Sequence, residues 1–132
     1  IPMPDADRTY NALLVEDTQE MADLVIMVLK RIGVSVHHAD NGQAAIEYID
    51  ENQPDVMLLD LNLPGVNGWD VLKHLYARYG EGTVPVIVTS AYSDGANRLI
   101  GRLQEVRRYL IKPFSPQELT RTVSEVLGME DE

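Results

Sequence analysis

Short apolar runs recur along the chain, and most of them stop abruptly at a polar residue. They cover residues 10–15, 34–39, 56–59, 84–88 and 109–111. The run at 56–59 shows no alternation of polar and apolar residues, which is typical of a central parallel strand covered on both faces. The pattern therefore predicts five strands.

Between these runs, apolar residues recur at every third or fourth position, as in amphipathic helices. Stripes of this kind lie within residues 21–32, 45–49, 71–79 and 119–127, and a weaker one lies within 93–105, where Gly95 and Gly101 each cost about 1 kcal/mol relative to Ala. Asn41 and Asn67 are expected N-caps. Ser115, with Glu118 three residues later, predicts a capping box at the last helix.

Strands that alternate with helices predict an α/β fold, a doubly wound five-stranded parallel sheet with helices on both faces. The 132 residues, 45% of them hydrophobic, suit one domain with a single core. We expect residues 1–9 to form a flexible leader, residues 10–128 the domain, and residues 129–132 an acidic tail.

Composition narrows the classes of function. A net charge of −10 disfavours nonspecific binding to nucleic acid or anionic lipid, because both require basic patches. The absence of cysteine excludes disulfides and thiolate chemistry. The sequence also shows neither an apolar run long enough to span a bilayer nor the basic-then-apolar pattern of a secretory leader, so nothing in it marks the chain as membrane-inserted or secreted. We therefore expect no direct nucleic-acid partner, no membrane partner and a cytoplasmic location.

Polar side chains interrupt or follow four of the five predicted strands. They are Glu16, Asp17, Asp60, Ser90 and Lys112. Each has a simpler interpretation when taken alone: a helix cap for Asp17 with Glu20, a turn residue for Asp60, a turn hydroxyl for Ser90 and a solvated cation for Lys112. However, the carboxyl ends of parallel strands meet at one edge of the sheet, where sites in such folds lie. Convergence on one site is therefore the better interpretation.

Three carboxylates held together repel one another, so we expect a cation to share their site. Oxygen ligands favour a hard divalent ion, and Mg²⁺ also commonly bridges to phosphoryl oxygens. Asp60 could then attack phosphorus and form an aspartyl phosphate, with Ser90 and Lys112 binding the phosphoryl oxygens. The chain lacks a Walker loop and a GxGxxG fingerprint, so a nucleotide is not the expected donor.

Four motifs along the chain resemble a known family. The acidic pair in LLVED, the aspartate in LLDLNLPGVNGW, the hydroxyl in PVIVTSAY and the lysine in YLIKPF occur in the order found in receiver domains of bacterial two-component response regulators. The resemblance spans about residues 10–127. It implies the flavodoxin-like strand order 2-1-3-4-5 and a phosphoryl donor that is a sensor histidine kinase or a phosphotransfer protein.

The resemblance also implies roles for individual residues. Asp60 is similar to the phosphorylated aspartate and Asp17 to a direct Mg²⁺ ligand, while Glu16 would act largely through water. Asn62 would contribute its backbone carbonyl to the metal. Ser90, rather than Thr89, aligns with the family's hydroxyl residue.

Further along the chain, Lys112 resembles the phosphate-binding lysine, and its bond to Pro113 resembles one that is usually cis. Tyr109 resembles the aromatic switch that rotates inward after phosphorylation. Asn62 and Tyr92 are expected to tune a slow self-dephosphorylation. The resemblance therefore implies a self-phosphorylating signalling domain, not a turnover enzyme.

One segment departs from the family. Receivers usually carry a Gly-Ala pair before the fifth strand, whereas residues 104–108 read QEVRR. The fourth helix, fifth strand and fifth helix usually form the surface for a homodimer or output partner, so the mode of partner binding is open here. Two other functions also remain open: a constitutive interaction module, and an aspartyl-phosphate phosphohydrolase. Phosphohydrolases of the haloacid dehalogenase type carry an aspartate at the position of Asn62.

His37 and His38 lie in the second predicted strand, with no further pair of ligands nearby in the sequence. We expect structural or surface roles for both rather than metal binding. Trp69 is expected to pack at the start of the third helix.

Overall fold

The computed structural model describes residues 9–61, 63, 65–91 and 108–129. Its strands are β1 (Tyr10–Val15), β2 (Val34–Ala39), β3 (Val56–Asp60), β4 (Val86–Ala91) and β5 (Arg108–Lys112). Its helices are α1 (Gln19–Lys30), α2 (Gly42–Glu51), α3 (Gly68–Tyr79) and α5 (Pro116–Leu127). The predicted helix within 93–105, residues 1–8 of the leader and residues 130–132 of the tail lie outside the described residues.

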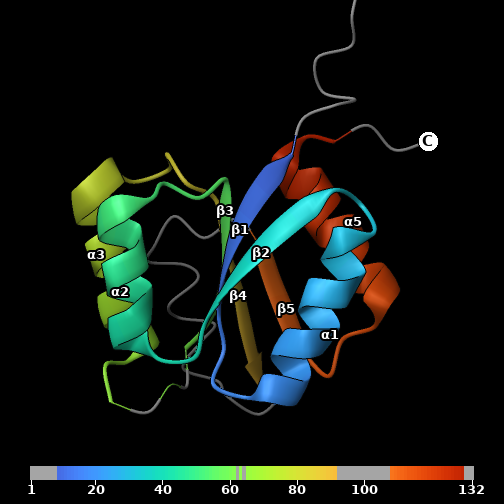
Figure 1. Cartoon of the computed structure of the whole chain (residues 1–132), viewed down its shortest axis with the longest axis horizontal. Helices are drawn as coiled ribbons and strands as arrows, with labels where there is room; N and C mark the ends of the chain where they lie inside the picture. Colours follow the sequence, from blue (N-terminus) through green and yellow to red (C-terminus); the bar gives the residue numbers. More distant parts are fainter. Residues whose placement is uncertain (1–8, 62, 64, 92–107, 130–132) are drawn as a thin grey trace, which may run out of the picture.

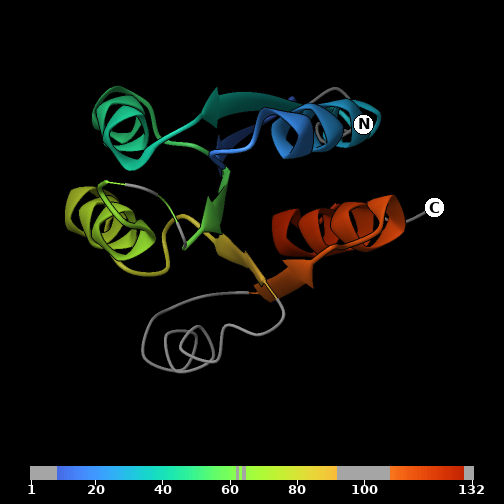
Figure 2. The same ribbon diagram turned by 90° about the horizontal axis from the view of Figure 1, so that it is seen from below.

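All five strands are parallel, in the order β2-β1-β3-β4-β5 (Figure 1). Helices α1 and α5 cover one face of this sheet, and α2 and α3 cover the other (Figure 2). This confirms the predicted fold class and strand order. Among the described residues, no helix has both the length and the apolar composition that crossing a bilayer requires.

Alternate residues of the central strands supply two separate hydrophobic cores. Leu13, Met57 and Val88 belong to the core beneath α2 and α3. Leu14 and Leu58 belong to the core beneath α1 and α5. The four residues before Asp60 in β3 are all fully buried, so the strand that carries this aspartate is held from both sides.

Helix starts agree with the predicted caps, except at α1. The side chains of Asn41 and Asn67 accept from the backbone N–H groups of the third residue along, at 2.8 Å and 3.0 Å. Ser115 and Glu118 form the predicted capping box. At α1 the N-cap is Thr18, with no side-chain capping bond, so the alternative of Asp17 as a cap was wrong.

The ends of two strands also differ from the prediction. β4 continues through Ser90 to Ala91 because its backbone pairs with β5, where Ser90 lies opposite Ile111. β5 likewise includes Lys112 as its last residue. Ser90 is therefore the last residue but one of β4 and Lys112 the last residue of β5, and neither is the first residue of a loop. The Lys112–Pro113 peptide bond is cis, as the resemblance implies.

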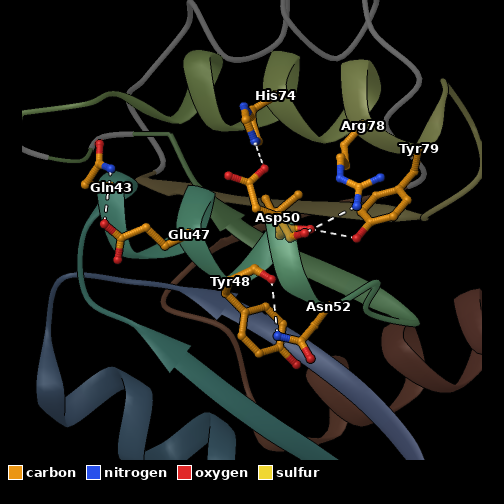
Figure 3. Close-up of polar contacts among 9 residues, drawn as sticks. Gln43, Glu47, Tyr48, Asp50, Asn52, His74, Arg78 and Tyr79 are labelled. Carbon is orange, nitrogen blue, oxygen red and sulfur yellow. Dashed lines mark hydrogen bonds and ion pairs between the residues drawn. The ribbon is translucent and has the colours of Figure 1, made fainter.

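Helices α2 and α3 are joined by polar contacts at the carboxyl end of α2 (Figure 3). His74 Nε2 lies 2.6 Å from Asp50 Oδ1, and Arg78 donates to the carbonyl of Asp50 at 3.3 Å. The Tyr79 hydroxyl donates to the carbonyl of Ile49 at 2.6 Å. Because the last carbonyls of a helix have no partner within it, side chains of α3 satisfy the open end of α2.

Candidate functional site

The predicted site begins with an ion-paired cluster at the carboxyl ends of three strands. Lys112 Nζ donates to Glu16 Oε1 at 2.8 Å and to Asp60 Oδ2 at 3.1 Å. Glu16 follows β1, whereas Asp60 and Lys112 end β3 and β5. Glu16 is 1% exposed and Asp60 4%, so both carboxylates are taken out of bulk water and need a cationic partner.

Asp17 completes an acidic cluster with these two residues. Glu16, Asp17 and Asp60 each offer an oxygen atom, and the three atoms lie within 4.8 Å of one another. Asp17 is exposed, so the cluster opens to solvent on its side. Three carboxylates and one ammonium leave two negative charges, which one divalent cation would balance. The donors are all hard oxygens, the set that suits Mg²⁺.

The charge of Lys112 is secured by its neighbours. Partial burial alone would lower the pKa of its ammonium group, but the hydrogen bonds to Glu16 and Asp60, with the attraction of their charges, outweigh that effect. The pKa of Lys112 is therefore raised above its ordinary value. The side chain remains a cation at neutral pH and offsets part of the repulsion among the carboxylates.

Ser90 follows the β4 residue that lies opposite Asp60, and Tyr109 lies three residues before Lys112 in the neighbouring strand β5. Ser90 is buried, and Tyr109 is half-buried against the core beneath α2 and α3. Tyr109 lies opposite Val88, so the alternation of side chains places Ser90 and Tyr109 on the same face of the sheet. Thr89 lies opposite Asp60 and takes the other face. The two predicted switch residues are thus close neighbours in the sheet.

Two glycines allow the loop after Asp60 to pack closely against the first residues of α2 and α3. A Cβ atom on Gly68 would lie 2.7 Å from Leu61 Cα and 2.9 Å from the carbonyl oxygen of Asp60. A Cβ atom on Gly42 would lie 2.4 Å from the carbonyl oxygen of Val66. The first residues of α2 and α3 therefore approach the backbone of this loop as closely as glycine alone permits.

The sequence did not reveal every residue around the site. It gave no reason for glycine at positions 42 and 68, although each follows an asparagine N-cap, which could have suggested close packing. His38, expected to be structural or on the surface, has its Nε2 atom 2.6 Å from the carbonyl oxygen of Glu16. Asn62 and Tyr92, and residues 104–107 of the atypical segment, lie outside the described residues.

Known proteins share both the sequence pattern and the fold. The family model described as response regulator receiver domain matches residues 12–124, nearly the whole of the described fold. This chain belongs to the response regulator receiver family. It is 35% identical over 117 residues to the sensory transduction protein RegX3 of Mycobacterium tuberculosis, covering 89% of this chain and 50% of RegX3. It is 34% identical over 120 residues to the DNA-binding response regulator MtrA of Mycolicibacterium paratuberculosis, covering 91% of this chain and 52% of MtrA.

This receiver domain therefore spans about half the length of the curated relatives that it matches.

Among solved structures, a putative response regulator from Chloroflexus aurantiacus has a TM-score of 0.83 at 30% identity, covering 92% of this chain and 99% of that one. The receiver domain of the sensor histidine kinase PA1611 from Pseudomonas aeruginosa, described with a magnesium ion coordinated in its active-site cleft, has a TM-score of 0.82 at 26% identity, with coverage of 92% and 99%. The chain is thus a receiver domain of two-component signalling, with an acidic cluster that could hold a metal ion.

Proposed function

We propose that Asp60 accepts a phosphoryl group from a phosphohistidine of a sensor histidine kinase or phosphotransfer protein. An oxygen of the Asp60 carboxylate attacks phosphorus, the P–N bond to the histidine breaks, and its electron pair returns to the imidazole nitrogen. The observation that supports this most directly is the pair of hydrogen bonds from Lys112 to Glu16 and Asp60. They hold an anionic nucleophile beside a cation at the open edge of the sheet.

Glu16, Asp17 and Asp60 would hold Mg²⁺, with the backbone carbonyl of Asn62 added on the strength of the family resemblance. When bound, the ion neutralises the carboxylates and the incoming phosphoryl oxygens. Lys112 supplies a second positive charge for those oxygens, and its elevated pKa keeps that charge at neutral pH. Ser90 can donate a hydrogen bond from its hydroxyl to the phosphoryl group.

Phosphorylation would act on partners through the sheet edge formed by β5. Drawing Ser90 toward the phosphoryl group makes room on the face that it shares with Tyr109, so the tyrosine ring can follow. The outer side of β5 and α5 is available to a partner: Ile111 is 49% exposed, and Arg108 pairs with Glu125 at 3.5 Å with both side chains about half exposed. A second copy in a homodimer, or an output domain, would bind to this surface, of which the predicted fourth helix would form the remaining part.

The proposal makes residues 10–128 a signalling domain, with residues 1–9 and 129–132 as a leader and tail. It is self-phosphorylating and only slowly loses its phosphoryl group, at a rate set in part by Asn62 and Tyr92. We propose a cytoplasmic location, because the histidine that donates the phosphoryl group is itself phosphorylated from ATP.

Incubation with Mg²⁺ and acetyl phosphate tests the acceptor. We expect the intact mass to rise by one phosphoryl group, the adduct to be released by hydroxylamine, and both results to be absent in Asp60→Asn. Asp23→Asn removes the same charge from an exposed position on α1 and should label like the wild type. An unlabelled wild type, or equal labelling of Asp60→Asn, would refute the assignment.

Light scattering with and without a beryllium fluoride mimic tests the output. Partner binding or dimerisation should increase with the mimic and be reduced by Ile111→Asp. Binding that is equally strong in Asp60→Asn without the mimic would instead favour a constitutive interaction module.

A further inference from the structure

His38 contacts the backbone of the acidic loop from the neighbouring strand. It is the last residue but one of β2, it is half-buried, and its Nε2 atom lies 2.6 Å from the carbonyl oxygen of Glu16. A carbonyl oxygen can only accept a hydrogen bond, so the imidazole N–H donates. The neighbouring His37 points to the other face of the sheet, where it stacks on Tyr48 with ring centroids 4.1 Å apart.

The carbonyl that His38 binds belongs to the peptide group between Glu16 and Asp17. On one side of that group, the N–H of Glu16 donates to the carbonyl of Ala39 at 3.1 Å. On the other side, the N–H of Thr18 donates to Glu16 Oε2 at 3.2 Å. The imidazole therefore helps to fix the orientation of the Glu16–Asp17 peptide group, one of the two peptide groups that flank the Cα atom of Asp17.

Neither burial nor a helix-capping role directs the Asp17 side chain. Its side chain is exposed, and the N-cap of the helix that follows makes no side-chain bond to the helix. Yet its carboxylate must reach within 4.8 Å of those of Glu16 and Asp60 for the three to share an ion. The direction of the Asp17 side chain consequently depends on the loop backbone, which His38 holds from outside the acidic cluster.

We propose that His38 is a positioning residue for the metal site, which it serves by fixing the Glu16–Asp17 peptide group. The inference rests on the proposed function, because it assumes that the acidic cluster binds Mg²⁺. Losing a hydrogen bond that orients a metal ligand typically weakens metal affinity by about 10- to 100-fold. Affinity for Mg²⁺ should therefore fall without His38, while the phosphorylation rate at saturating Mg²⁺ stays near that of the wild type.

The variants His38→Leu and His38→Gln separate positioning from packing. Leucine fills the site without a donor, whereas the glutamine amide places an N–H at a similar reach. We expect calorimetry to show Mg²⁺ binding weakened by about tenfold or more in His38→Leu and within about twofold of the wild type in His38→Gln. His37→Leu removes an imidazole that makes no contact with Glu16, and it should bind Mg²⁺ as the wild type does.

Phosphorylation by acetyl phosphate across a range of Mg²⁺ concentrations gives a second readout. In His38→Leu the half-saturating Mg²⁺ concentration should rise while the maximal rate is kept, a split that loss of packing alone would not produce. If His38→Leu does not fold, His38→Asn replaces it in the test. The asparagine side chain is one methylene shorter than glutamine and should not reach the carbonyl of Glu16, so this variant should also bind Mg²⁺ weakly. Wild-type affinity for Mg²⁺ in folded His38→Leu or in His38→Asn would overturn the inference. A wild-type protein that binds no Mg²⁺ would overturn the proposed function itself.

Discussion

The acidic cluster should destabilise the metal-free protein, and Asp17→Asn should relieve this. Two unit charges 4.8 Å apart repel by about 1 kcal/mol in water and by about 3–4 kcal/mol at an effective dielectric constant of 20. Asp17 is exposed, so the lower figure applies to each of its two repulsions, and the ammonium of Lys112 offsets part of their sum. We expect Asp17→Asn to raise the free energy of unfolding by about 1 kcal/mol.

Urea unfolding in EDTA, followed by circular dichroism, measures this gain. Asp23→Asn is the matched control, because it removes one negative charge from α1 away from the cluster while keeping the oxygen that accepts from Gln19. Mg²⁺ should reverse the ranking. A ligand that binds only the folded state stabilises it by RT ln(1 + [L]/Kd), so the wild type should gain more than Asp17→Asn.

The reasoning fails if Asp17→Asn unfolds at the same or a lower urea concentration than Asp23→Asn in EDTA. That result would mean that the three carboxylates do not repel one another measurably in the folded protein, and the need for a divalent cation would lose its physical basis.

Three further predictions concern the surroundings of the site. Gly68→Ala should lower the free energy of unfolding by about 1–3 kcal/mol, measured in urea, because the added methyl group would press on the backbone of Leu61. Lys112→Met should lower it by about 1–3 kcal/mol at neutral pH in EDTA, because the two buried carboxylates lose the ammonium group that both contact. The pKa of the Tyr48 phenol is raised, mainly by burial and to a smaller extent by the charges of Asp55 and Tyr79. The free energy of unfolding should therefore fall as the pH rises from about 10, where the phenol of the unfolded chain ionises, through the raised pKa of the folded protein. Tyr48→Phe should remove both this alkaline loss and the contribution of one phenolate that forms above pH 10 to the absorbance at 295 nm, and a titration identical to that of the wild type would contradict the assignment.

Much of the fold could be predicted because apolar runs and capping residues carry local signals. Asn41, Asn67 and Ser115 cap the helices that they were expected to cap, because a short polar side chain beside the first helical residues satisfies local N–H groups. The end of β4 was missed because Ser90 is polar and buried, and hydrogen bonding to β5 extends the strand beyond its apolar run. Pairing with a distant edge strand leaves no periodic signal in the sequence.

The sequence predicted which charged side chains form the candidate site, but not the neighbouring residues that hold its backbone in place. Asp60 and Lys112 stood out because charged residues end apolar strands, and parallel topology then places both at one edge. The contact between His38 and the backbone of Glu16 gives no such signal, because it depends on the register in which β1 and β2 pair. The roles of Gly42 and Gly68 likewise depend on how closely two helices approach one loop.

The two hydrogen bonds of Lys112 also link the site to the order in which the chain is made. They join residues 96 and 52 positions apart, so Glu16 after β1 and Asp60 at the end of β3 are synthesised long before their counter-charge. A chain that has left the ribosome only as far as β4 carries all three carboxylates and lacks the ammonium. Docking of β5 therefore adds the edge strand to the sheet and brings the ammonium group of Lys112 to the acidic cluster in the same event.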